Sequence, residues 1–259
     1  MGEDFAGRAG LVTGAGSGIG RAAALKFASE GAKVVIADVD MDGSEATKAM
    51  IEQIGGEAIC VRTDVSQAEE VAAMVEQTVA AYGRLDFAFN NAGIAGDIVP
   101  LIDYSEELWD RVIGINLKGV WLCMKYEIKQ MLAQSLTHGG GGAIVNTASV
   151  MGLISSASNP VAYTASKHGV IGITKNAALG YAASGIRVNA VCPGYIVTPL
   201  VEGILERHPE RKAQIMADHP VGRLGVPEEI SEAAVWLCSD AASFVNGTAM
   251  TVDGGYVAH

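Results

Sequence analysis

The feature that most constrains the fold is an alternation, along the whole chain, between short apolar runs and longer segments of helical period. The short runs are rich in β-branched residues and almost continuously apolar, which is typical of parallel strands buried on both faces. They span residues 9–14, 32–38, 57–64, 84–93, 142–149, 186–194 and 248–255. Between them, apolar residues recur at intervals of three and four in segments 20–31, 43–55, 68–83 and 227–240. The alternation predicts an α/β fold, a doubly wound and mainly parallel sheet flanked by helices on both faces, as one domain over residues 1–259.

Composition narrows the partners and the compartment. The 29 acidic residues outnumber the 18 basic ones, and the formal charge of −11 would repel a phosphate backbone, so we expect no nucleic acid partner. The start of the chain lacks a basic segment followed by an apolar one, and no run of 18 apolar residues occurs, so we expect a soluble, cytoplasmic protein without a membrane partner. The four cysteines are far apart and the five histidines show no ligand spacing, which predicts no metal site.

The first expected strand is followed by a glycine-rich turn, TGAGSGIG, at residues 13–20. Its glycines allow a tight turn and let the backbone approach a pyrophosphate at the N-terminus of the following helix. Such a turn can also form without a ligand. Asp38 favours the ligand: it lies 18 residues after Gly20, at the end of the second expected strand, where a carboxylate can accept hydrogen bonds from the adenosine ribose of NAD. Together the two features predict a dinucleotide site.

The same carboxylate bears on which cofactor binds. A ribose phosphate about 4 Å from Asp38 would cost roughly 4 kcal/mol for each pair of charges at an effective dielectric constant of about 20. The sequence therefore predicts NAD (NADH) as the cofactor and disfavours NADP. The alternative is that Asp38 caps the turn that follows it, a role that Asp40 or Asp42 could also fill.

Tyr163 and Lys167, within AYTASKHG at residues 162–169, are four positions apart and would share one face of a helix. They are either ordinary helix-surface residues or a catalytic pair. Oxidation of an alcohol by hydride transfer needs a base at the hydroxyl, and a tyrosine serves only if its pKa falls from about 10 to about 7, which requires roughly 4 kcal/mol. A lysine cation about 5 Å away supplies on the order of 3 kcal/mol, and the oxidised nicotinamide can supply the remainder.

Over essentially its whole length the chain resembles the short-chain dehydrogenase/reductase family, NAD(P)-dependent enzymes of Rossmann fold with a Ser-Tyr-Lys site. The matching segments are TGAGSGIG, NNAG at 90–93, NLKG from Asn116, PGYIVT at 193–198, Ser149 and the YxxxK pair. The resemblance implies that Asn116, Ser149, Tyr163 and Lys167 are catalytic. Ser149 would hold the substrate oxygen, and Asn116 would position a water chain that carries the proton from Lys167 outward. The resemblance also implies cofactor contacts from Gly14, Ser17, Gly18, Ile19, Asp38, Asp64, Val65, Asn91, Ala92, Gly93, Tyr163, Lys167, Pro193, Gly194, Ile196 and Thr198.

One departure from the family pattern lies between Ser149 and Tyr163. The two residues are 14 positions apart, one more than the resemblance predicts. The extra residue lies in GLISSASNP at 152–160, where it would reshape the wall of the substrate pocket. Ser155 is therefore an alternative to Ser149 as the serine that faces the substrate.

The substrate pocket is expected to be mainly apolar with few polar groups. Its predicted walls include Met151, Leu153, Asn159, Tyr195 and Val197, and residues 199–225 form either a lid over the substrate or an ordinary surface hairpin of helices. We expect a neutral secondary alcohol or ketone, cyclic or aryl-substituted, as the small-molecule substrate. Two alternatives stay open: a 3-oxoacyl reductase of fatty-acid synthesis, usually NADPH-linked, and a non-catalytic nucleotide-sensing scaffold, which would be free to lose Tyr163 or Lys167.

Apolar surface points to self-association. The mean hydropathy of +0.27 leaves more apolar side chains than a monomer of this length needs to expose. Segments 121–132, 169–183 and 245–257 are candidate shared surfaces. The family resemblance implies a homotetramer with two-fold axes, and the alternative is a monomer whose apolar residues all lie inside.

Overall fold

A computed structural model describes residues 4–138, 141–155, 159–208 and 210–258. Its strands form one sheet in the order β3-β2-β1-β4-β5-β6-β7, and every neighbouring pair runs parallel. The strands are β1 (Ala9–Thr13), β2 (Lys33–Asp38), β3 (Glu57–Arg62), β4 (Phe87–Asn90), β5 (Gly142–Thr147), β6 (Ile186–Pro193) and β7 (Ala249–Val252). The predicted doubly wound parallel sheet is confirmed, although each strand is shorter than the apolar run that predicted it.

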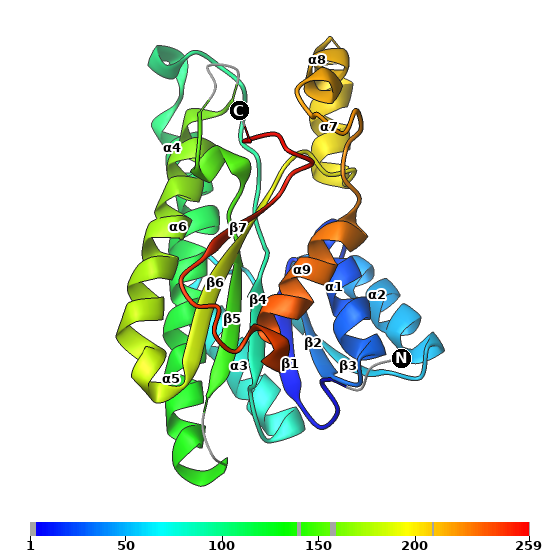
Figure 1. Cartoon of the computed structure of the whole chain (residues 1–259), viewed down its shortest axis with the longest axis vertical. Helices are drawn as coiled ribbons and strands as arrows, with labels where there is room; N and C mark the ends of the chain where they lie inside the picture. The colour runs from blue at the N-terminus through cyan, green and yellow to red at the C-terminus, as the bar shows by residue number, and fades with distance from the viewer. Residues whose placement is uncertain (1–3, 139–140, 156–158, 209, 259) are drawn as a thin grey trace.

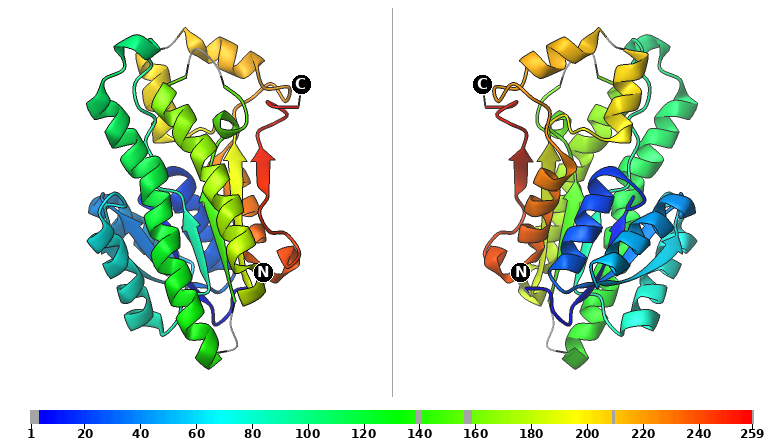
Figure 2. Two further views of the ribbon diagram at one scale, coloured as in Figure 1. Left: turned by 90° about the vertical axis from the view of Figure 1, so that its left-hand side faces the viewer. Right: turned by 90° about the vertical axis from the view of Figure 1, so that its right-hand side faces the viewer.

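Helices cover both faces of the sheet (Figures 1 and 2). One face carries α1 (Gly18–Ser29), α2 (Met41–Gln53) and α9 (Pro227–Cys238), and the other carries α3 (Ala68–Tyr82), α5 (Val120–His138) and α6 (Val161–Tyr181). A short helix, α4 (Glu106–Ile113), leads through a π-helical turn (Gly114–Gly119) into α5. Two further helices, α7 (Pro199–Arg207) and α8 (Arg211–Ala217), stand beyond the carboxyl ends of the strands, at the top of Figure 1.

Each face of the sheet has its own apolar core. Phe5, Phe27 and Phe87 pack together on the α1 face, with the rings of Phe27 and Phe87 stacked at a centroid distance of 4.2 Å. Met74 and Met131 are fully buried on the other face. The prediction that every strand is buried on both faces is wrong for the edge strands β3 and β7, which are partly exposed because they lie at the borders of the helical layers.

The fourth strand shows why the apolar runs overestimate strand length. Before β4, the Asp86 carboxylate accepts a hydrogen bond from the Ala9 amide at 2.9 Å. Residues 84–86, which the apolar pattern assigned to the strand, therefore precede it. After β4, the amides of Asn91 and Ala92 donate to Thr13 Oγ1 at 3.0 and 3.1 Å, and the chain leaves the sheet. The ends of β1 and β4 are thereby joined where the strand order reverses, the usual place for a ligand crevice in such sheets.

Three properties of the described residues concern membranes, metals and thiols. No helix among them is long and apolar enough to cross a membrane. Nor do three or more His, Cys, Asp or Glu side chains gather in the described ranges as a metal site would require. The four cysteines are free thiols, and burial raises the pKa of Cys60 and Cys192 to about 11, so these two are poor nucleophiles at neutral pH.

Candidate active site

The glycine-rich turn between β1 and α1 is too tight for side chains at two positions. Gly14 has a φ of +65°, a conformation that favours glycine. A Cβ atom at Gly20 would overlap the Gly14 carbonyl oxygen, so the turn folds directly onto the helix. Ser17 is the N-cap of α1, and its side chain makes no capping hydrogen bond. The turn thus presents backbone amides and the Ser17 hydroxyl at the carboxyl end of the sheet, as a pyrophosphate site requires.

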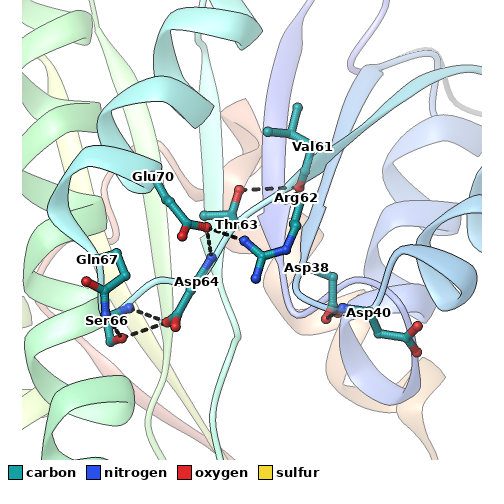
Figure 3. A network of polar contacts seen from close by, with 9 residues as sticks. All are labelled: Asp38, Asp40, Val61, Arg62, Thr63, Asp64, Ser66, Gln67 and Glu70. Carbon is teal, nitrogen blue, oxygen red and sulfur yellow. Dashed lines mark hydrogen bonds and ion pairs between the residues drawn. The ribbon is translucent and has the colours of Figure 1, made fainter.

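Asp38, the last residue of β2, is held against this turn. Its Oδ2 accepts a hydrogen bond from the Gly16 amide at 2.8 Å, and its Oδ1 accepts one from the Asp40 amide at 3.0 Å. Asp40 is the N-cap of α2 and accepts from the Gly43 amide at 3.1 Å. Asp38 therefore does cap the turn that follows it, through the Asp40 amide, while Asp40 caps α2 (Figure 3). The Asp38 carboxylate also lines the cleft.

A second acidic residue follows the neighbouring strand β3. Asp64 Oδ1 accepts hydrogen bonds from the amide and hydroxyl of Ser66 at 2.9 and 2.7 Å (Figure 3). The Asp64 amide donates to Glu70 Oε2 at 2.8 Å, and Glu70 also pairs with Arg62 at 2.9 Å. These bonds fix the loop after β3, so that Asp64 and Val65 line the cleft beside Asp38.

Tyr163 and Lys167 lie one turn apart on α6, with Lys167 Nζ 5.5 Å from the centre of the Tyr163 ring. Lys167 is 3% exposed, and its ammonium group donates to the Thr147 carbonyl at 2.7 Å. Burial lowers the pKa of Lys167 to about 8. Burial also raises the pKa of Tyr163, and a hydrogen bond with Ser149 opposes that rise. The expectation that Lys167 supplies most of the stabilisation of a Tyr163 phenolate stays a prediction.

The structure distinguishes the two candidate serines. Ser149 caps the short 3₁₀ turn Val150–Gly152, and its side chain lowers the pKa of the Tyr163 phenol against the effect of burial. Ser155 is exposed, and residues 156–158 of the inserted segment lie outside the described residues. Ser149 is therefore the serine that shares the cleft with Tyr163.

Asn116 is fully buried in the π-helical turn, and it does not line the cleft. Its Nδ2 donates to the Ile94 carbonyl at 2.8 Å, and its Oδ1 accepts from the Ile94 amide at 2.9 Å. A Cβ atom at Gly93 would lie 3.2 Å from Asn116 Oδ1 and 3.8 Å from Lys167 Nζ. The Asn116 side chain therefore holds the loop after β4 through Ile94. It lies next to Gly93, which is also close to Lys167, and it does not itself line the cleft.

One cleft of about 700 Å³ brings the predicted residues together. All sixteen predicted cofactor residues line it, together with Ser149, Met151, Asn159 and Tyr195. Leu153 and Val197 do not line it, and their prediction as pocket residues is wrong. Leu153, 41% exposed, follows the 3₁₀ turn and faces solvent; Val197, 42% exposed, points away because its neighbour Ile196 takes the inward position. The backbone of the glycine-rich turn, the carboxylates of Asp38 and Asp64 and the cleft volume fit a dinucleotide.

Several lining residues were missed by sequence reasoning. They are Val39, Thr63, Ser66, Ile94, Ala95, Asp110, Arg111, Gly114, Ile115, Thr147, Ala148, Val150 and Pro160. Pro199, Leu200, Val201 and Ile204 also line the cleft, but they belong to the segment that was predicted as a lid. Asp110, Arg111, Gly114 and Ile115 share one face of α4 and its π-helical extension, and this three- and four-residue spacing just before Asn116 was a usable signal. Leu200, Val201 and Ile204 lie within the predicted lid segment on α7.

The fold and the cleft together define a dinucleotide-dependent oxidoreductase. The family model described as enoyl-(acyl carrier protein) reductase matches residues 14–257. The chain is 44% identical to cyclohexanol dehydrogenase of Acinetobacter sp. (strain SE19), over 99% of this chain and 97% of that protein. It is 47% identical to cis-4-hydroxycyclohexanecarboxylate dehydrogenase of Sinomonas cyclohexanicum, over all of both chains. The chain belongs to the short-chain dehydrogenase/reductase family.

Solved structures agree with this membership. The crystal structure of levodione reductase superimposes with a TM-score of 0.92 at 40% identity, over 98% of this chain and 99% of that one. A protein from Agrobacterium tumefaciens solved with NADP has a TM-score of 0.88 at 37% identity, over 99% of both chains. A 3-ketoacyl-(acyl-carrier-protein) reductase from Brucella melitensis, solved with NADH, has a TM-score of 0.89 at 35% identity, over 97% of this chain and 98% of that one. Similar structures thus hold either nicotinamide cofactor.

Proposed function

We propose that this protein interconverts a cyclic secondary alcohol and its ketone, with NAD as the hydride carrier and Tyr163 as the general acid and base. The observation that carries the proposal is the single cleft in which the dinucleotide turn and the group formed by Ser149, Tyr163 and Lys167 meet. The similar proteins act, by their names, on cyclohexanol and on a hydroxycyclohexanecarboxylate. Alcohol–ketone interconversion is the common chemistry of the site and of these relatives.

Each polar group has one part in the reaction. A nicotinamide cofactor held by the glycine-rich turn and Asp38 would supply the hydride acceptor or donor for the carbinol carbon. The Ser149 hydroxyl hydrogen-bonds the substrate oxygen, and Tyr163 removes the hydroxyl proton as the carbonyl forms. Lys167, whose pKa is about 8, is cationic at neutral pH and stabilises the phenolate, while the Thr147 carbonyl fixes its ammonium group. Asn116 supports the loop beside Lys167 and is proposed to order the water that carries the proton away.

Asp38 supports NAD over NADP. Two backbone amides hold its carboxylate at the cleft, so it cannot turn away from a phosphate on the adenosine ribose without losing both hydrogen bonds. The repulsion of about 4 kcal/mol per charge pair at about 4 Å would then oppose NADP binding.

The lining supports a neutral substrate and a closing helix. Leu200, Val201 and Ile204 give α7 an apolar side toward the cleft, so we propose that residues 199–225 form the lid, apart from residue 209, which lies outside the described residues. The polar groups near Met151 are Asn159 and Tyr195, which hydrogen-bond each other at 3.1 Å. Asp110 and Arg111 on α4 also line the cleft, but the neutral pair beside Met151 suits a hydroxyl or carbonyl on the ring better than a phosphate.

A panel of cyclic and linear secondary alcohols and their ketones, assayed by nicotinamide absorbance with each cofactor, tests the proposal. We expect turnover of cyclic alcohols with a kcat/KM at least tenfold higher for NAD than for NADP. Preference for NADP would contradict the role of Asp38. Activity confined to 3-oxoacyl thioesters would favour the fatty-acid reductase, and cofactor binding without any turnover would favour a nucleotide-sensing scaffold.

We also propose that the protein is a homotetramer. Leu179, in candidate segment 169–183, is 85% exposed. Phe244, directly before candidate segment 245–257, is fully exposed. Trp121 on α5, 47% exposed, adds the third surface. Light scattering at micromolar concentration should give about four times the chain mass of 26.8 kDa, and a mass near that of one chain would contradict the proposal.

A further inference from the structure

His219, which follows α8, is buried among residues from three distant segments. It is 3% exposed, and its ring lies 5.9 Å from the ring of Tyr195 and 4.9 Å from that of Tyr256. A Cβ atom at Gly194 would lie 2.9 Å from His219 Nε2, so the imidazole rests directly on the nicotinamide-side loop. The histidine therefore joins the end of the lid segment, the loop after β6 and the C-terminal residues.

The hydrogen bonds of the imidazole define its tautomer. Nδ1 lies 2.7 Å from the Ile215 carbonyl oxygen, which can only accept, so Nδ1 carries the proton. Nε2 lies 3.3 Å from the Tyr195 amide nitrogen, which can only donate, so Nε2 is the acceptor. Both ring nitrogens thus have a hydrogen-bond partner in this tautomer. An imidazole protonated at Nε2, or an apolar side chain at this position, could not accept the hydrogen bond from the Tyr195 amide.

We propose that His219 is a positioning residue for the substrate pocket, acting through Tyr195. Its Nε2 fixes the Tyr195 backbone and its ring supports the Tyr195 ring, so that the Tyr195 phenol can donate to Asn159 at 3.1 Å across the pocket wall. The same imidazole is bonded to Ile215 in α8, which couples this wall to the lid. The inference rests on the proposed function, since it assigns Tyr195 to the substrate side of that cleft.

Two variants separate the hydrogen bond to Tyr195 from simple filling of the core. In His219→Gln the amide stands near the position of Nε2 and can accept from the Tyr195 amide. In His219→Asn the shorter amide stands near Nδ1 and can bond only Ile215. Because the hydrogen bond to the Tyr195 amide is lost in His219→Asn but not in His219→Gln, we expect KM for the best alcohol of the panel to rise about tenfold in His219→Asn, with kcat within about threefold of wild type. His219→Gln should restore the KM to within about threefold.

A double-mutant cycle tests whether the effect passes through Tyr195. In a Tyr195→Ala background, His219→Asn should add no more than about twofold to KM, because the residue it positions is gone. If the effects of His219→Asn and Tyr195→Ala on KM multiply in the double variant, the proposal is overturned. Equal KM values in His219→Gln and His219→Asn would also overturn it.

Two measurements need no substrate and so remain informative if the proposed function fails. Hydrogen–deuterium exchange of the Tyr195 amide, measured on the intact protein, should be at least about tenfold faster in His219→Asn than in wild type or His219→Gln. The ¹⁵N NMR signals of histidine-labelled wild type should show His219 protonated at Nδ1 and not at Nε2. A proton on Nε2, or unchanged exchange in the Asn variant, would overturn the positioning role even if both variants fold less well.

Discussion

Replacement of Glu127 by Gln tests how the sheet tolerates a buried acid. Glu127 lies on α5 with 0% exposure, and its Oε2 accepts from Asn90 Nδ2 at 3.0 Å. Asn90 Nδ2 also donates to Asn146 Oδ1 at 3.0 Å, so the carboxyl group belongs to a polar network between α5 and the ends of β4 and β5. No cation is paired with it among the ion pairs of the described residues. Burial raises the pKa of Glu127 from 4.5 to about 8.

The raised pKa sets the sign and size of the effect. Above about pH 4.5 the unfolded chain loses the Glu127 proton while the folded protein keeps it until about pH 8, so the wild type loses stability as pH rises through this window. At about 1.4 kcal/mol for each pH unit, the loss amounts to roughly 3 kcal/mol at pH 7 and roughly 5 kcal/mol at pH 8. Glutamine does not titrate, so Glu127→Gln avoids this loss.

Urea unfolding of both proteins at one protein concentration, at pH 5, 6, 7 and 8, measures the difference in free energy of unfolding. The contributions of all other titrating groups to the pH dependence cancel in this difference. Any change in hydrogen bonding caused by the glutamine amide in place of the carboxyl group adds an amount that does not depend on pH. We expect the variant to gain on the wild type by about 1 kcal/mol or more for each pH unit. A difference that stays constant between pH 5 and pH 8 would refute the reasoning.

Three further substitutions have definite expected outcomes. Tyr163→Phe should lower turnover at least about 10²-fold and leave NADH affinity, measured by fluorescence titration, nearly unchanged, because it removes the proton-transfer group only; retained turnover would contradict the tyrosine mechanism. Lys167→Ala should impair turnover and also weaken NADH binding about tenfold, since the family resemblance makes this lysine a cofactor contact as well; unchanged affinity would exclude that second role. Gly20→Ala should weaken NADH binding at least about tenfold, because its Cβ would displace the Gly14 carbonyl from the cofactor turn, and wild-type affinity would mean that the turn adapts freely.

Sequence periodicity and spacing predicted the features that depend on local structure. Tyr163 and Lys167 share a helix face, so their spacing alone brought them together, and the glycine turn needed only the strand before it and the helix after it. The alternation of elements predicted a parallel sheet, but the order that places β1 beside β4 arises from contacts between distant residues, such as Thr13 with Asn91.

The errors concern the direction of side chains and their surroundings. Val197 was predicted in the pocket, but in an extended segment neighbouring residues point oppositely, and Ile196 has the inward position. Asn116 was predicted from its motif, and that role stays a prediction; the sequence could not show that both ends of its amide bind Ile94. Glu127 and His219 were overlooked because a search for ligand spacing ignores single polar residues in apolar surroundings. Met124, Ile128 and Met131, near Glu127 on α5 and buried, were a usable signal that this carboxyl group faces the core.

The central claim is that a hydride passes directly between the carbinol carbon of a cyclic alcohol and the nicotinamide, with Tyr163 handling the proton. Cyclohexanol deuterated at the carbinol carbon, incubated with NAD and the enzyme, provides the most direct test. We expect cyclohexanone and NADH carrying one deuterium at the nicotinamide ring, detected by mass spectrometry, and at least about a 10²-fold lower rate in Tyr163→Phe. Ketone formed with unlabelled NADH, or labelled NADH formed equally fast by Tyr163→Phe, would contradict it.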